Sequence, residues 1–183
     1  MKEGYWNVTT ELGYTKMFKR HLGLWRWVDE FMALNKIKSV FEVGPGLLDN
    51  INKKVEIYQS VDLTKNGNSI YDDFTTMNLD EFKGKFDLLL ACAVVEHCNG
   101  YRDFFKRALD IKAKFVVISF FNGINRYEEH IKTVSDKHTN EFKFYLNSYS
   151  QREMEKELDK LGVLNKSEFI TLGRKNSILI IRL

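Results

Sequence analysis

An apolar strand followed by a glycine turn constrains the fold of this chain more than any other stretch. Residues Ser39–Gly46 read Ser-Val-Phe-Glu-Val-Gly-Pro-Gly. The β-branched and aromatic residues suit a strand buried on both faces, and Gly44 and Gly46 end it abruptly. Because these glycines lack a Cβ, the turn accepts positive φ angles and lets a ligand approach its backbone. Apolar residues at helical spacing follow from Leu47 to Ile51, so the stretch predicts a strand, a turn and a helix start, typical of a nucleotide site.

Length and composition indicate one domain. The chain has 183 residues, 44% of them hydrophobic, which is enough for one full core and too little for two, so we expect a single domain over residues 1–183. The formal net charge is +3, and Lys and Arg are spread along the chain, which does not predict nucleic-acid binding. No apolar run approaches the roughly 20 residues of a membrane helix. The first ten residues also lack an apolar signal core, so we expect a cytoplasmic protein without a membrane partner.

Helical and strand patterns alternate along the chain. Residues 1–36 form a helical preface, with amphipathic spacing from residue 11 to residue 34. A helical pattern also covers Tyr101–Ile111. The strand patterns after the first one cover Val55–Leu63, Ile70–Tyr71, Phe86–Cys92 and Phe115–Phe121. This alternation predicts an α/β fold with a doubly wound, mostly parallel sheet.

The last third of the chain breaks this rhythm. Residues 122–148 mix polar and aromatic side chains without a firm period, which predicts a partly structured insertion or lid over the site. A helical pattern then covers Gln151–Leu161. Its start suggests a capping box, and a glycine ends it, with Ser150, Glu153 and Gly162 in these roles. Two β-prone stretches, Glu168–Leu172 and Ser177–Leu183, are separated by four residues, which predicts an antiparallel hairpin.

Few residues outside the glycine turn suggest chemistry on their own. Asp62 ends the second predicted strand, sixteen residues after Gly46. In strand–helix–strand units an acid there accepts hydrogen bonds from ribose hydroxyls, although Asp62 is also a common turn former. Cys92 and Cys98 fit no zinc spacing, so we expect two buried free thiols and no metal site.

From Ser39 to Leu183 the chain resembles the class I S-adenosylmethionine-dependent methyltransferases. Their first motif, an acid followed by Gly-x-Gly, is matched by Glu42–Gly46, with Leu48 in place of a third glycine. Their fourth strand, Phe-Asp with apolar residues and a Val-Glu-His ending, is matched closely by Phe86–His97. A dehydrogenase-like dinucleotide fold is the alternative, but Asp49 stands where its third glycine is expected.

The resemblance implies a Rossmann-like, three-layer α/β/α sandwich with a seven-stranded, mostly parallel sheet and a C-terminal antiparallel hairpin. It implies S-adenosyl-L-methionine as cofactor. Asp62 would hold the ribose, Asp73 or, in a competing register, Asp72 would bind the adenine amino group, and Phe74 would lie against the base. The full set of implied cofactor residues is Glu42, Gly44, Pro45, Gly46, Asp62, Leu63, Asp72, Asp73, Phe74, Ala91 and Cys92.

The implied reaction is methyl transfer to a small-molecule acceptor, most simply a hydroxyl, by in-line displacement. His97 is the candidate base, and a structural hydrogen bond at the helix start is its alternative role. His130 and His138 are rival bases. The chain has no Asn/Asp-Pro-Pro-Tyr segment, so acceptors of the adenine or glutamine amino-group enzymes are disfavoured. A catalytically silent, methyltransferase-like binding or regulatory protein remains the alternative, and the sequence does not indicate an oligomeric state.

Overall fold

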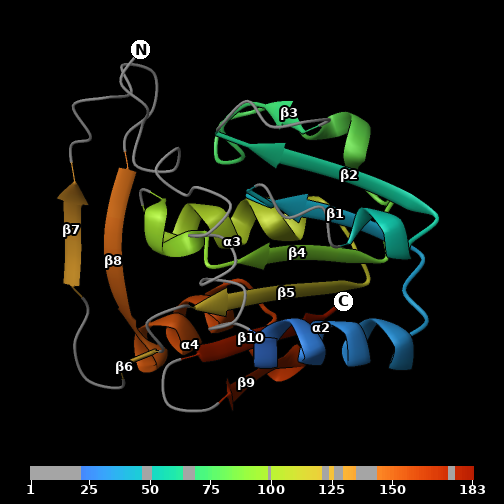
Figure 1. Cartoon of the computed structure of the whole chain (residues 1–183). Coiled ribbons are helices and arrows are strands. Elements are labelled where there is room, and N and C mark those ends of the chain that lie inside the picture. The colour runs from blue at the N-terminus through green and yellow to red at the C-terminus, as the bar shows by residue number, and fades with distance from the viewer. Residues whose placement is uncertain are drawn as a thin grey trace.

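The computed structural model describes residues 22–46, 51–63, 69–98, 100–120, 124–125, 130–134, 144–172 and 176–183. Seven strands form the main sheet, in the order β3-β2-β1-β4-β5-β10-β9 (Figure 1). The first five of these pair in parallel, and β10 runs antiparallel to both β5 and β9. The predicted mostly parallel sheet with a C-terminal hairpin is therefore confirmed. The strands are β1 Ser39–Val43, β2 Ile57–Asp62, β3 Ile70–Tyr71, β4 Leu88–Cys92, β5 Phe115–Phe120, β9 Ser167–Leu172 and β10 Asn176–Arg182.

The central strands are buried because their side chains are apolar on both faces. All five residues of β1 are buried, and β4 beside it is buried at four of five positions. The sheet begins slightly later than the sequence pattern predicts. In β4 the first strand residue is Leu88 and not Phe86, because Asp87 hydrogen-bonds with the segment before β1 through both its backbone and its carboxylate.

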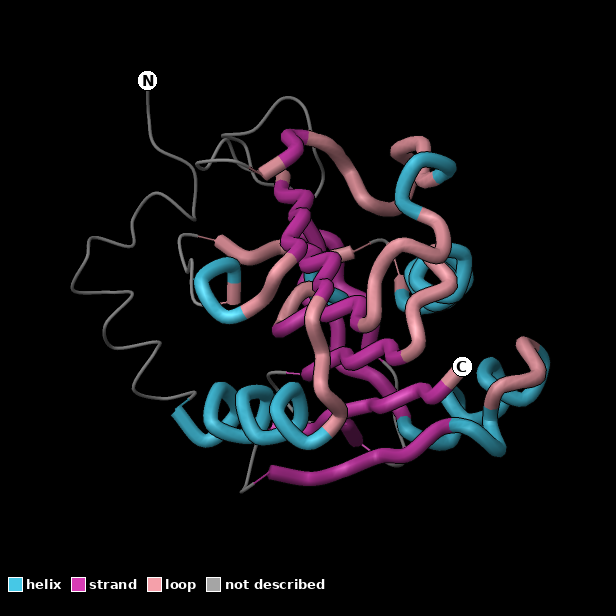
Figure 2. Tube along the Cα trace, turned by 90° about the vertical axis from the view of Figure 1, so that its right-hand side faces the viewer, coloured by secondary structure: helices cyan, strands magenta, loops and turns pink. Residues whose placement is uncertain are grey.

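Helices cover both faces of the sheet (Figure 2). Helix α2, Leu22–Leu34, buries Leu24, Val28, Phe31 and Met32 on one face. The other face is covered by α3, Tyr101–Asp110, and α4, Gln151–Lys160. The first 21 residues of the predicted preface lie outside the described residues, as do four residues of the helix predicted after the glycine turn. Short 3₁₀ helices complete the fold: η1 Asn52–Lys54, η2 Asp80–Phe82, η3 Val95–His97 and η4 Leu164–Lys166.

The start of α4 differs from the prediction in its capping. Ser150 occupies the N-cap position, but its side chain makes no capping hydrogen bond. The Glu153 carboxylate accepts a hydrogen bond from Lys156 at 2.7 Å, so the predicted capping box is wrong. The predicted stop is confirmed, because Gly162 has a φ of +71° and its N–H donates to the Asp159 carbonyl.

The insertion contains a second sheet that the sequence pattern did not reveal. Strands β6 (Ile124–Asn125), β7 (His130–Val134) and β8 (Phe144–Ser150) pair in the order β6-β8-β7. Figure 1 shows β7 and β8 standing beside the edge toward which the arrowheads of β4 and β5 point. Strands of the predicted insertion therefore lie beside the carboxyl edge of the main sheet.

Asp87 links the starts of β1, β4 and β5 at the opposite edge of the main sheet. Its Oδ2 accepts hydrogen bonds from the backbone N–H groups of Lys38 (2.9 Å) and Ser39 (3.1 Å), and its Oδ1 lies 2.7 Å from the Lys114 Nζ. Burial acts to raise the pKa of the Asp87 carboxyl, but the hydrogen bonds from Lys114, Lys38 and Ser39 outweigh it, so the pKa is lowered.

We expect Asp87→Asn to destabilise the fold at neutral pH by about 1.5–3 kcal/mol, the size of a charged hydrogen bond. Because the pKa is lowered in the folded state, this contribution is present above the unfolded pKa of about 3.9 and is lost as pH falls through the folded pKa. Urea unfolding of variant and wild type across this range measures both effects. Asp103→Asn, at an exposed ion pair, is the control. Equal stability of wild type and Asp87→Asn at neutral pH would contradict the assignment.

Candidate functional site

The glycine turn after β1 is fixed to the end of β2. The Gly44 N–H donates to the Val61 carbonyl at 2.8 Å, and the Gly46 N–H donates to the Asp62 Oδ2 at 2.9 Å. Gly44 and Gly46 have φ angles of +66° and +61°, as the sequence predicted, with Pro45 between them. The turn and the acid at the tip of β2 therefore form one unit.

Glu42 lies beneath this turn. Its side chain is only 1% exposed, and its Oε2 accepts a hydrogen bond from the Tyr58 hydroxyl at 2.7 Å. Residues 42 and 60 are direct partners in the parallel pairing of β1 with β2, which places Tyr58 one pleat below. The arrangement puts a carboxylate under the turn and keeps it out of bulk water.

The two competing acids after β3 lie beside Asp62. The Asp72 N–H donates to the Asp62 carbonyl at 3.2 Å, and both acids are half-buried, as is Leu63. The Asp73 Oδ1 accepts from the Thr75 N–H (2.8 Å) and hydroxyl (2.7 Å), while the Asp72 Oδ1 accepts from the Asp73 N–H. The structure thus brings the acids predicted at β2 and β3 to one edge of the sheet.

Phe74 packs in the core behind the two acids. Its ring is 4% exposed and lies 5.0 Å from the Phe104 ring and 6.2 Å from the Phe41 ring, measured between centroids. The implied contact of Phe74 with adenine stays a prediction.

The tip of β4 joins the site from the other side. Ala91 is fully buried and pairs with Val43 of β1. Burial raises the pKa of the Cys92 thiol, and the nearby Glu42 carboxylate raises it further. Both Cys92 and Cys98 are free and half-buried, and a raised pKa favours the protonated thiol of Cys92.

The chain leaves β4 through a backbone conformation that is rare for alanine. Ala93 has a φ of +57°, and its N–H donates to the Ser119 carbonyl (3.1 Å) and hydroxyl (3.2 Å). Val94 then covers the glycine turn, since a Cβ added to Gly44 would lie 2.6 Å from the Val94 Cγ2. The loops after β1 and β4 are thus in direct contact.

His97 ends η3, which follows this loop. Its backbone N–H donates to the Val94 carbonyl at 2.8 Å, and the residue is half-buried. Cys98 follows η3 directly. Burial raises the pKa of its thiol, and the nearby carboxylates of Asp73 and Glu96 raise this pKa further. The tips of β3 and β4 are therefore close enough to interact electrostatically.

Strand β8 holds the segment that carries His97. The Tyr149 hydroxyl donates to the Val95 carbonyl at 2.9 Å, and the Asn147 Nδ2 donates to the Cys98 carbonyl (2.9 Å) and to the Tyr149 oxygen (2.8 Å). The Asn147 side chain is fully buried, and among the described residues none donates a hydrogen bond to its Oδ1. The rival bases His130 and His138 are not placed here, because the described residues exclude their side chains.

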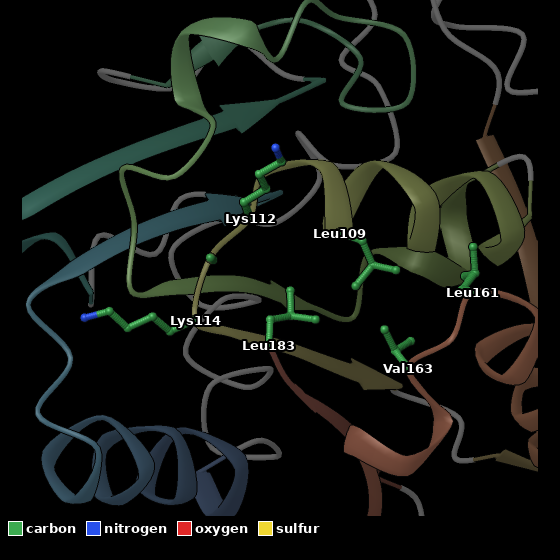
Figure 3. A pocket seen from close by; sticks show the side chains of 7 residues that line it. Leu109, Lys112, Lys114, Leu161, Val163 and Leu183 are labelled. Carbon is green, nitrogen blue, oxygen red and sulfur yellow. The ribbon is translucent and has the colours of Figure 1, made fainter.

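One hollow lies away from these residues. It measures about 440 Å³ between α3, the segment after α4 and the end of the chain. Figure 3 shows that the side chains of Leu109, Leu161, Val163 and Leu183 converge on it. The side chains of Lys112 and Lys114 point away from it. Within the described part of the chain, no cluster of His, Cys, Asp and Glu is placed to hold a metal, and no helix is long and apolar enough to cross a bilayer.

Solved structures that are similar to this chain include a methyltransferase and proteins in complex with S-adenosylhomocysteine. The chain superposes on the DhpI complex with S-adenosylhomocysteine (TM-score 0.65, 11% identity, 97% of this chain and 93% of that chain). It also superposes on the N-terminal domain of EvdMO1 with SAH bound (0.63, 11%, 87% and 80%). The 1,6-didemethyltoxoflavin-N1-methyltransferase of Burkholderia thailandensis matches as well (0.62, 12%, 96% and 84%).

The chain has the class I S-adenosylmethionine-dependent methyltransferase fold. No protein-family model matches the sequence, and no curated protein matches it. At 11–12% identity the methyltransferase fold is shared, while the side chains of the site must be judged in this chain.

Several residues that shape the site of this methyltransferase fold were not found from the sequence. They are Tyr58, Ala93, Ser119, Asn147 and Tyr149. Each acts through a partner on another element, and no local pattern marks such a contact. Of these, only Asn147 lies within the polar and aromatic insertion that the sequence analysis placed over the site.

We expect Gly44→Ala to destabilise this fold, because a left-handed backbone costs about 1–2 kcal/mol for alanine and the contact with Val94 adds about 1–3 kcal/mol of overpacking. Adding Val94→Ala to the Gly44→Ala variant should recover the stability lost to overpacking, while the cost of the left-handed backbone remains. Urea unfolding of the two single variants and the double variant measures both.

Gly84→Ala is the matched control for this comparison. Gly84 has a similar φ of +70°, but nothing lies within 4 Å of an added Cβ. If Gly44→Ala costs no more than Gly84→Ala, the loops after β1 and β4 are not in the contact described.

Proposed function

We propose that the protein is an S-adenosylmethionine-dependent methyltransferase that transfers a methyl group to a small-molecule acceptor, most simply a hydroxyl. One observation carries the proposal: the glycine turn after β1 is hydrogen-bonded to the acid at the tip of β2, with further acids beside it after β3. Carboxylates at this edge suit the hydroxyls of a ribose and the positive charge of a sulfonium or ammonium group.

The residues present fit this cofactor in several ways. Gly44 and Gly46 leave backbone uncovered where a ligand would approach, and Glu42 places negative charge beneath the turn. Asp62 would hold the ribose, and Asp73 or Asp72 the adenine amino group. Pro45, Leu63, Ala91 and Cys92 lie around the same turn and strand tips. The names of the similar structures support the proposal, since DhpI and EvdMO1 were solved with S-adenosylhomocysteine.

When bound, the cofactor supplies an electrophilic methyl group on a sulfonium. The protein then has to hold an acceptor nucleophile in line with that group and exclude water. We assign the acceptor side to the edge of the sheet where β8 packs on η3 through Tyr149 and Asn147, because this edge lies beside the tips of β1 and β4. His97, at the end of η3, is the base that would take the proton of a hydroxyl acceptor.

Asn147 supports an acceptor that carries a hydrogen-bond donor. Its Nδ2 is oriented by two acceptors, so the position of its Oδ1 is fixed as well. A buried acceptor without a donor costs about 1–3 kcal/mol, which a hydroxyl or amine of the ligand would recover. The toxoflavin precursor bound to the Burkholderia thailandensis enzyme shows that a methyltransferase of this fold can accept a small molecule.

We expect wild-type protein to bind S-adenosylhomocysteine in isothermal titration calorimetry, and Asp62→Ala to weaken binding by about 1.5–3 kcal/mol for each charged hydrogen bond lost. Asp159→Ala, at an exposed acid on α4, is the control with unchanged affinity. A wild-type protein that does not bind S-adenosylhomocysteine at millimolar concentration would rule out the proposed function and favour a silent, methyltransferase-like protein.

With an acceptor found by screening small hydroxyl and amine compounds for S-adenosylhomocysteine release, we expect His97→Gln to lower kcat by about 10²–10⁴-fold, the usual contribution of a general base. Calorimetry should show unchanged affinity for S-adenosylhomocysteine. A His97→Gln enzyme that keeps its rate would assign His97 to a structural hydrogen bond instead.

A further inference from the structure

Arg107 on α3 binds two main-chain carbonyls of a turn that is distant in sequence. Its Nε donates to the Phe74 carbonyl at 3.2 Å, and its Nη2 donates to the Met77 carbonyl. A guanidinium presents donors in a rigid, planar fork, whereas a lysine ammonium is a point charge on a flexible stem. The arginine is half-buried and both partner residues are buried, so water competes little for these hydrogen bonds.

The turn held in this way begins with Asp73. The Asp73 carbonyl accepts from the N–H groups of Thr76 (3.0 Å) and Met77 (2.9 Å), so the four-residue turn is internally bonded. The Phe74 ring packs on Phe104, which also belongs to α3, at 5.0 Å. The position of the Asp73 carboxylate relative to the sheet therefore depends on how α3 holds the turn.

Packing secures only part of this turn. A hollow of about 350 Å³ lies between it and the start of α3, lined by Thr75, Thr76, Gly100, Asp103, Lys106 and Arg107. Because a hollow lies on this side of the turn, the turn has room to shift when the arginine contacts are lost. The two hydrogen bonds from Arg107 span this gap.

We propose that Arg107 is a positioning residue for the adenine end of the cofactor site, acting through the turn that places Asp73. The proposal rests on the function proposed above. It makes a specific demand: loss of Arg107 must reduce recognition of the adenine amino group more than it reduces binding of the rest of the cofactor.

The test compares two ligands, S-adenosylhomocysteine and S-inosylhomocysteine, in which an oxo group replaces the adenine amino group. In calorimetry the wild type should prefer the adenosyl compound by about 10- to 100-fold, the value of a charged hydrogen bond. Arg107→Lys should reduce this preference about fivefold or more, while affinity for the inosyl compound stays nearly unchanged. Asp73→Asn should reduce the preference as well, and Arg107→Lys should add little to it in the double variant.

Arg102→Lys is the matched control, because Arg102 lies on the same helix but stacks on Tyr101 and faces Glu157. It should leave the preference unchanged. If Arg107→Lys weakens both ligands equally, or has no effect, Arg107 has a general structural role and the proposal is overturned while the proposed function stands. If the wild type binds neither ligand, both are overturned. Thermal unfolding of each variant shows that the comparison is made on folded protein.

Discussion

Two hydrogen bonds between the glycine turn and the end of β2 determine the geometry of the whole candidate site. They run from the Gly44 N–H to the Val61 carbonyl and from the Gly46 N–H to the Asp62 carboxylate. Both glycines have positive φ angles, which glycine adopts without the cost that a Cβ imposes. Because the turn is joined to the acid, the carboxylate that would meet a ribose and the backbone that would approach the cofactor are positioned by one interaction.

The edge of the sheet where the parallel strands begin and the edge where they end carry different charged residues. The loops before β1, β2, β4 and β5 expose pairs of lysines, which are Lys36, Lys38, Lys53, Lys54, Lys83, Lys85, Lys112 and Lys114. Four of these lysines form ion pairs, with Glu56, Asp29, Asp80 and Asp87. At the other edge the described residues at the ends of β1 to β4 include the acids Asp62, Asp72, Asp73 and Glu96, with Glu42 beneath the turn. Neighbouring carboxylates repel one another, so a cationic ligand is stabilised at this edge and an anionic one is not.

The sequence predicted what depends on local pattern and missed what depends on distant partners. Apolar runs at β1, β4 and β5 and the period of α3 were sufficient to give the sheet and its helices, and strand ends gave the acids. Phe74 shows the limit, because an aromatic residue after an acid looks the same whether it faces adenine or packs on Phe41 and Phe104. The capping box at Ser150 failed, since Lys156 draws Glu153 away from the helix start.

The two sides of the candidate site differ in how firmly they are held. At the tips of β1 and β4, Ala93 keeps a left-handed conformation that costs about 1 kcal/mol or more, and it does so because Ser119 holds its N–H. Val94 then lies against Gly44, since a Cβ added to that glycine would come to 2.6 Å from the Val94 Cγ2. The turn after β3, in contrast, borders a hollow on one side, and an arginine of α3 donates to two of its carbonyls. A ligand at this edge would therefore meet a preformed surface at β1 and β4, and any adjustment to its shape would fall on the turn that carries Asp73.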